Sequence, residues 1–203
     1  MLEFFYINYL SCFLSHEQKI YNIVAVLLIG RTMGIVEMNK SKRGLREKMK
    51  EFDYYIFIDF SEKLIGCSII EKEKLKELLP KISRFRHYRE AKNRKLYLKN
   101  VNKTIKRDNI KSSFLRLKIK EMHKNMEIYL DVLEFLKKHE KCIIFISVDN
   151  RQYSAFRKMV NIVDGENVII KQESELIKGT PEYQTSLVLD NLLNIERLKN
   201  EQL

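Results

Sequence analysis

The sequence predicts an α/β domain built on a mixed sheet, with antiparallel strands first, parallel strands later and helices on its flanks. Two short apolar runs, at residues 54–60 and 64–70, stand close together as the strands of a hairpin do. Two later runs, at residues 142–149 and 167–172, alternate with helical segments, a pattern typical of parallel βαβ units. The 203 residues suit one domain with an appended segment, and the 45% of hydrophobic residues excludes a disordered chain.

The first run, YYIFIDF, is apolar on both faces, so we expect a central strand that is buried on both sides. The polar residues Ser61, Glu62 and Lys63 then turn the chain into LIGCSII, which is its hairpin partner. A helical and basic pattern starts at Glu71, and Pro80 is expected to begin a second helix.

The middle of the chain predicts a short third strand at residues 94–101, with Leu96 and Leu98 on one face. One long amphipathic helix is then expected over residues 110–139. Its apolar residues recur at alternating steps of three and four: Leu115, Ile119, Met122, Met126, Tyr129, Leu133 and Leu136.

The end of the chain predicts a helix at residues 150–160 and a final helix that runs to residue 199. The break Gly179-Thr180-Pro181 marks the start of this final helix, with Thr180 as its N-cap and Pro181 at its first helical position.

The positive charge of the chain is concentrated in one block. The formal net charge is +11, yet residues 72–124 alone contain 19 Lys and Arg against 5 Asp and Glu, which leaves −3 for the remainder. Such clustering favours a nucleic-acid partner, DNA or RNA. A solvated helix face or a membrane surface would be the alternatives. The expected phosphate contacts are Arg84, Arg86, Arg89, Lys92, Arg94, Lys95, Lys106, Arg107 and Arg151.

Residues 1–48 differ from the domain expected at residues 49–203. They contain two apolar runs, of which the second is shorter than the roughly 20 residues that span a bilayer, and they lack a signal-peptide pattern. Three interpretations stay open: a helical hairpin packed on the domain, an interfacial membrane anchor, or sequence upstream of the true start, with Met49 opening the domain. We expect a cytoplasmic protein without a stable membrane association.

Three carboxylates are candidates for a common site. Asp59 and Asp149 stand near the ends of two buried strands, and the carboxyl ends of parallel strands meet at one edge of a sheet. Asp190 lies at the border of the apolar face of the last helix, beside Asn191 and Asn194. Asp149 would alternatively be a helix N-cap, and Asp190 would alternatively be a boundary residue in solvent.

A set of carboxylates from two strands and a helix suits Mg²⁺ or Mn²⁺, which prefer oxygen ligands. Two such ions about 4 Å apart activate water and stabilise the leaving oxygen in phosphodiester hydrolysis. The sequence contains no P-loop, GxGxxG or GxSxG motif, so no small-molecule cofactor is expected. The separation of Cys12, Cys67 and Cys142 argues against a disulfide scaffold or a structural zinc site.

Over residues 52–199 the chain resembles the ribonuclease H-like (retroviral-integrase-like) superfamily, including its uncharacterised prokaryotic members. The matching pieces are IFIDFSE with its hairpin partner, the aspartate that ends CIIFISVD and the aspartate of SLVLDNLL. The resemblance implies a strand order of 3-2-1-4-5, here with a basic, mostly helical insert at residues 72–124, and two-metal catalysis on nucleic acid. It implies Asp59, Asp149 and Asp190 as catalytic metal ligands, with Glu62, Glu173 and Glu175 as further candidates.

The sequence therefore predicts a metal-dependent nuclease. The alternative is a catalytically inactive module of the same fold that binds nucleic acid or protein, and it would bind in a salt-sensitive manner without cleavage.

Overall fold

The computed structural model describes residues 52–164 and 168–200, so the expectations for residues 1–48 lie outside the described part. The strands are β1 (Tyr54–Ser61), β2 (Leu64–Glu71), β3 (Arg116–Glu121), β4 (Cys142–Ile146) and β5 (Ile169–Gln172). The helices are α3 (Lys72–Ile82), α4 (Arg94–Arg107), α5 (Asn125–Leu136), α6 (Asn150–Asp164) and α7 (Pro181–Asn200). Short 3-10 helices are η1 (Tyr88–Glu90), η2 (Ile110–Ser113), η3 (Met122–Lys124) and η4 (Glu173–Glu175).

The five strands form one mixed sheet in the order β3-β2-β1-β4-β5. The pairs β1–β2 and β2–β3 are antiparallel, whereas β1–β4 and β4–β5 are parallel. The predicted fold class is therefore confirmed, and the strand order is the one that the ribonuclease H-like resemblance implies. Because β1, β4 and β5 run parallel, their carboxyl ends lie at the same edge of the sheet.

The third strand lies elsewhere than the sequence predicts. Residues 94–101 belong to α4, where Leu98, Val101 and Ile105 are buried at helical spacing while Leu96 is 53% exposed. The expected long helix over residues 110–139 is also wrong, because β3 and η3 interrupt it before α5 begins. Within β3 the alternation of apolar and lysine residues fits a strand, and pairing with β2 overrides the weaker helical spacing.

The basic block at residues 72–124 is consequently not a separate insert, because its last part supplies the edge strand β3 as well as α3 and α4. Pro80 does not begin a new helix but lies inside α3, which ends two residues later at Ile82. A proline lacks the N–H that helical hydrogen bonding requires, and here it lies in the last turn of the helix.

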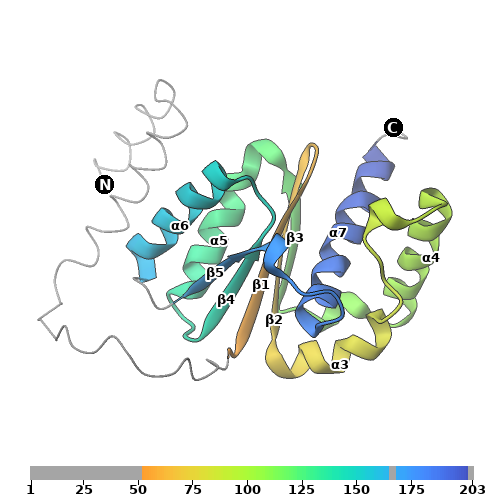
Figure 1. Cartoon of the computed structure of the whole chain (residues 1–203), viewed down its shortest axis with the longest axis horizontal. Helices are drawn as coiled ribbons and strands as arrows, with labels where there is room; N and C mark the ends of the chain where they lie inside the picture. Colours follow the sequence, from red (N-terminus) through yellow and green to blue (C-terminus); the bar gives the residue numbers. More distant parts are fainter. Residues whose placement is uncertain (1–51, 165–167, 201–203) are drawn as a thin grey trace, which may run out of the picture.

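The helices form two layers on opposite faces of the sheet (Figure 1). Side chains of α5 and α6 pack with Ile56 and Ile58 of β1, whereas α3, α4 and α7 pack with Phe57. Since side chains alternate along a strand, Asp59 falls on the face of Phe57 and so points toward α7. No helix in the described ranges is long and apolar enough to cross a membrane.

Helix α7 approaches β2 closely at Gly66, the residue that pairs with Asp59 across the hairpin. A Cβ atom at Gly66 would lie 2.8 Å from Leu189 Cδ1 and 3.2 Å from Leu193 Cδ2. The absence of a side chain therefore lets the two leucines pack directly on the strand. Thr180 caps α7 as expected, since its Oγ1 accepts a hydrogen bond from the N–H of Tyr183 at 3.3 Å.

We predict that Gly66→Ala lowers the free energy of unfolding by about 1–2 kcal/mol, because the new methyl group overlaps Leu189. Urea denaturation followed by circular dichroism measures this change. The matched control is Ser68→Ala on the same face of β2, where a buried hydroxyl without a hydrogen-bond partner in the described ranges is removed. This control is expected to be neutral or stabilising. Equal loss in both variants would contradict a special role of Gly66.

Candidate active site

A row of polar residues follows the parallel strands at their carboxyl ends. Ile58 of β1 is level with Ile146 of β4, which is level with Gln172 of β5. Asp59 follows Ile58 within β1, Ser147 follows the end of β4, and Glu173 follows the end of β5. The N–H of Ser147 still donates to the carbonyl of Ile58 at 2.9 Å, so β4 stays aligned with β1 at this point.

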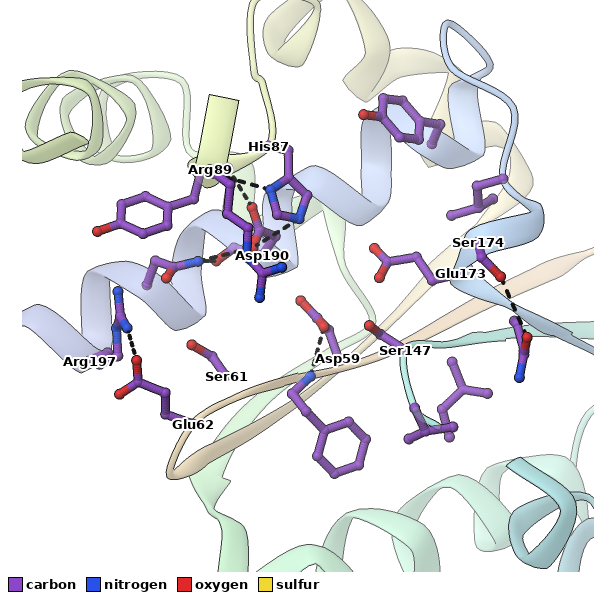
Figure 2. Close-up of a pocket in the computed structure, with 18 of the residues that line it drawn as sticks. Asp59, Ser61, Glu62, His87, Arg89, Ser147, Glu173, Ser174, Asp190 and Arg197 are labelled. Carbon is purple, nitrogen blue, oxygen red and sulfur yellow. Dashed lines mark hydrogen bonds and ion pairs between the residues drawn. The ribbon is translucent and has the colours of Figure 1, made fainter. Parts of the chain in front are cut away.

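Helix α7 covers this row with Asp190, and the three carboxylates of Asp59, Glu173 and Asp190 line one cavity of about 730 Å³. In Figure 2 the side chains of Asp59 and Glu173 point into the same space below α7, with Ser147 beside Asp59. Asp190 is 7% exposed, so the alternative of a boundary residue in solvent is wrong.

Asp59 is a buried carboxyl with acidic neighbours. Burial raises its pKa well above the usual 3.8, and the charges of Glu173 and Asp190 raise it further. Two hydrogen bonds oppose this effect: the N–H of Phe60 donates to Asp59 Oδ1 at 2.7 Å, and the hydroxyl of Ser147 also bonds to the carboxylate. The described residues thus hold Asp59 in a place that disfavours its charged form.

Asp190 already has partners on both oxygens. The N–H of Tyr88 donates to Oδ2 at 3.0 Å, and the amide of Asn194 donates to Oδ1 at 3.0 Å. His87 Nε2 lies 4.0 Å from Oδ1. Because His87 Nδ1 accepts from the N–H of Arg89 at 3.2 Å, the proton of the neutral ring sits on Nε2 and faces Asp190.

Other polar side chains of α7 hold the segment between α3 and η1 by its main chain. Gln184 Nε2 donates to the carbonyls of Ile82 and Phe85 at 2.6 and 2.9 Å. Asn191 Nδ2 donates to the carbonyl of Arg86 at 3.1 Å. The amide nitrogens of these side chains thus meet backbone carbonyls, which offsets part of the cost of their burial.

Cationic side chains also line the cavity. Two guanidinium groups lie over the ring of Tyr88, with Arg94 at 5.4 Å and Arg197 at 5.5 Å from its centroid. Arg89 also lines the cavity, and Lys178 pairs with Glu90 at 2.9 Å. Acidic and basic side chains therefore line the same cavity.

The expected phosphate contacts separate into groups. Arg89 and Arg94 line the cavity, whereas Arg84, Arg86 and Lys92 line a neighbouring groove. The other four positions line neither of these two hollows. They are Lys95 and Lys106 on the exposed side of α4, Arg107 in an ion pair with Asp108 at 2.8 Å, and Arg151 in the first turn of α6.

Three of the expected acidic ligands do not join Asp59 at the centre. Asp149 follows the end of β4 by three residues and caps α6, where its Oδ1 accepts from the N–H of Gln152 at 2.8 Å. Glu175 accepts from the N–H of Gln172 at 2.8 Å and closes η4. Glu62 lies at the hairpin turn on the cavity edge and pairs with Arg197.

Sequence reasoning missed Ser147 and His87. Along β4 the side chains of Ile143 and Phe145 face α7, so the next residue of this alternation is Ser147 and not Asp149. No sequence signal marks His87, because the contact with Asp190 joins segments far apart in the chain.

The chemistry of the donors fits a hard divalent cation, since Asp59, Glu173 and Asp190 offer only carboxylate oxygens. Their mutual repulsion at Asp59 is also the kind of interaction that a cation relieves. Even so, no three His, Cys, Asp or Glu residues in the described ranges stand in a ready-made metal-binding arrangement.

No protein-family model and no curated protein matches the chain. Among solved structures, one similar chain comes from the complex of RNase HII with PCNA from Archaeoglobus fulgidus. The identity is 13%, the alignment covers 72% of this chain and 76% of that chain, and the TM-score is 0.40.

We predict that Asp59→Asn raises the free energy of unfolding near neutral pH in the presence of EDTA. A raised folded-state pKa means that the folded state binds the proton more tightly, so stability falls as pH rises above 3.8 toward that pKa. The ionised group then costs about 1.4 kcal/mol for every tenfold increase in proton affinity. Denaturant titrations of both proteins between about pH 4 and 8 measure the difference, which should vanish at the acidic end.

The control for this experiment is Asp149→Asn, which removes a charge from a helix N-terminus. Its effect should have the opposite sign, because a negative charge stabilises that position. A wild-type protein that is more stable than Asp59→Asn at neutral pH would contradict the predicted burial cost.

Proposed function

We propose that the protein hydrolyses phosphodiester bonds of nucleic acid, DNA or RNA, with the help of Mg²⁺ or Mn²⁺. The observation that carries this proposal is the meeting of Asp59, Glu173 and Asp190 around one cavity that cationic side chains also line. Carboxylates from the ends of β1 and β5 and from a covering helix make an oxygen-rich centre. Phosphate groups would meet the cationic side chains of the same cavity.

Asp59, Glu173 and Asp190 would hold the metal ions. When bound, such ions lower the pKa of the attacking water and stabilise the leaving oxygen. Asp59 would be the central ligand, because the charges of both Glu173 and Asp190 act on its carboxyl group. The Ser147 hydroxyl and the N–H of Phe60 would fix the direction of its carboxylate.

The cationic side chains that line the cavity would position the substrate. Arg89 and Arg94 line the cavity and carry permanent charges that suit the oxygens of a phosphate. The stacking of Arg94 on Tyr88 restricts its side chain, so less conformational freedom is lost when it binds.

One observation favours a second candidate function, a catalytically inactive module that binds nucleic acid. Both oxygens of Asp190 already accept hydrogen bonds, from Tyr88 and Asn194, which satisfies this carboxylate without a metal. Such a module would bind nucleic acid equally well with and without EDTA.

We predict Mn²⁺- or Mg²⁺-dependent cleavage that Asp59→Asn and Glu173→Gln each reduce by about 10²–10³-fold, as expected for loss of a group that stabilises the transition state. The assay incubates the protein with single-stranded DNA, double-stranded DNA, RNA and an RNA–DNA hybrid, with either metal ion or with EDTA. Product analysis on denaturing gels measures the rate.

Asp149→Asn tests which carboxylates form the centre. It keeps an oxygen that can cap α6, and its side chain lies outside the residues that line the cavity, so cleavage should stay within about threefold of wild type. Loss of cleavage in this variant would instead support the metal ligands expected from sequence, among which is Asp149. Binding without any metal-dependent cleavage in wild type would support the inactive module instead.

A further inference from the structure

A second hollow lies beside the cavity and has a different character. This groove has a volume of about 470 Å³, and we name it the α4 groove. The residues that line it include Arg84, Arg86, Lys92, Asn93, Leu96 and Tyr97. No Asp or Glu lines it, whereas four carboxylates line the cavity. The groove thus has the charge that suits phosphate groups, without the acidic donors that suit a metal ion.

The α4 groove and the cavity share one short segment as their common wall. Within residues 84–94, the side chains of Arg84, Arg86 and Lys92 line the groove, while Arg89 and Arg94 line the cavity. A polymer that occupies both the cavity and the groove therefore has to pass this segment.

Hydrogen bonds hold the main chain of the shared segment, residues 84–94, while its cationic side chains stay exposed. The Tyr97 hydroxyl accepts from the N–H of Arg86 at 2.7 Å and donates to its carbonyl at 2.8 Å. Asn191 bonds to the same carbonyl from the α7 side. Arg84, Arg86 and Lys92 themselves are exposed, so their charges are available to a partner at the surface.

The α4 groove also offers surface for nucleobases. Leu96 is 53% exposed on its edge, and Tyr97 is half-buried beside it. Unpaired bases gain from contact with apolar and aromatic side chains, and their backbone gains from the neighbouring cations.

We propose that the α4 groove binds a single-stranded polynucleotide whose neighbouring nucleotides occupy the cavity. This inference rests on the proposed function for the part of the strand in the cavity. A flexible single strand can follow an irregular path past residues 84–94, whereas a duplex, with a persistence length of about 150 base pairs, would lose free energy by bending over so short a distance. Exposed bases are likewise available only in a single strand.

The test compares two triple variants of the full chain that remove the same charge. The groove variant is Arg84→Ala/Arg86→Ala/Lys92→Ala, and the control is Lys76→Ala/Lys99→Ala/Lys103→Ala, whose residues are exposed on α3 and α4 outside both hollows. Fluorescence anisotropy measures binding of a labelled single-stranded DNA of about 20 nucleotides and of the same strand annealed to its complement, in EDTA at several salt concentrations.

We expect the groove variant to lose at least about tenfold in affinity for the single strand, and the control less than about threefold. The slope of log affinity against log salt should become shallower by about 2 for the groove variant, which reflects three lost phosphate contacts. Tyr97→Phe should weaken binding several-fold with an unchanged slope, since it loosens the wall but removes no charge. Wild type should bind the single strand more tightly than the duplex.

Equal losses in both triple variants, or duplex binding as tight as single-strand binding, would overturn this inference. Because binding is measured in EDTA, these outcomes are independent of cleavage. If wild type cleaves nucleic acid but both triple variants lose the same affinity, only the proposal for the α4 groove is refuted. If the groove variant loses more affinity than the control but wild type shows no cleavage, only the proposed nuclease activity is refuted.

Discussion

The packing of α7 on the sheet is the contact on which the site depends. Gly66 leaves room for Leu189 and Leu193 to lie directly on β2, which brings the helix over the end of β1. The residue after Leu189 is Asp190, so the same approach delivers a carboxylate to the cavity that Asp59 lines. On either side of Leu189 along the helix, Gln184 and Asn191 hold residues 82–86 by their carbonyl groups. One helix therefore positions both Asp190 and the main chain of residues 82–86.

Burial at Asp59 sets the energetic character of this centre. A charged carboxylate that is withdrawn from water beside Glu173 and Asp190 is unfavourable, and the two hydrogen bonds to it offset only part of the cost. The neutral form or a nearby cation would relieve the rest. Proteins keep such unfavourable groups where function requires them, and the fold must supply the missing stability elsewhere. Here the two apolar layers on either face of the sheet supply it.

Glu173 was a candidate only through the ribonuclease H-like resemblance. Local patterns were enough to predict four strands and the start of α7, and they marked Asp59 and Asp190 as candidates. They failed where the deciding contact was distant in sequence. The alternation within β3 is compatible with a strand, but only the pairing with β2 decides against a helix there. Helix α4 resembled a strand because two leucines alternate. An error in the end of β4 made Asp149 seem to lie beside Asp59. The alternation of side chains in a strand gives that place to Ser147.

The cationic side chains after α3 stay exposed because α7 holds this part of the chain by its main chain. The bonds from Gln184 and Asn191 reach carbonyl oxygens of residues 82–86, so the folded position of this segment does not depend on its arginine side chains. Those side chains stay exposed, whereas Asp59 and Asp190 are buried. Burial raises the pKa of Asp59 and disfavours its charged form, whereas exposure leaves the cations open to a polyanion. Substitutions of the exposed cations should therefore alter binding and leave the fold and the acidic centre in place.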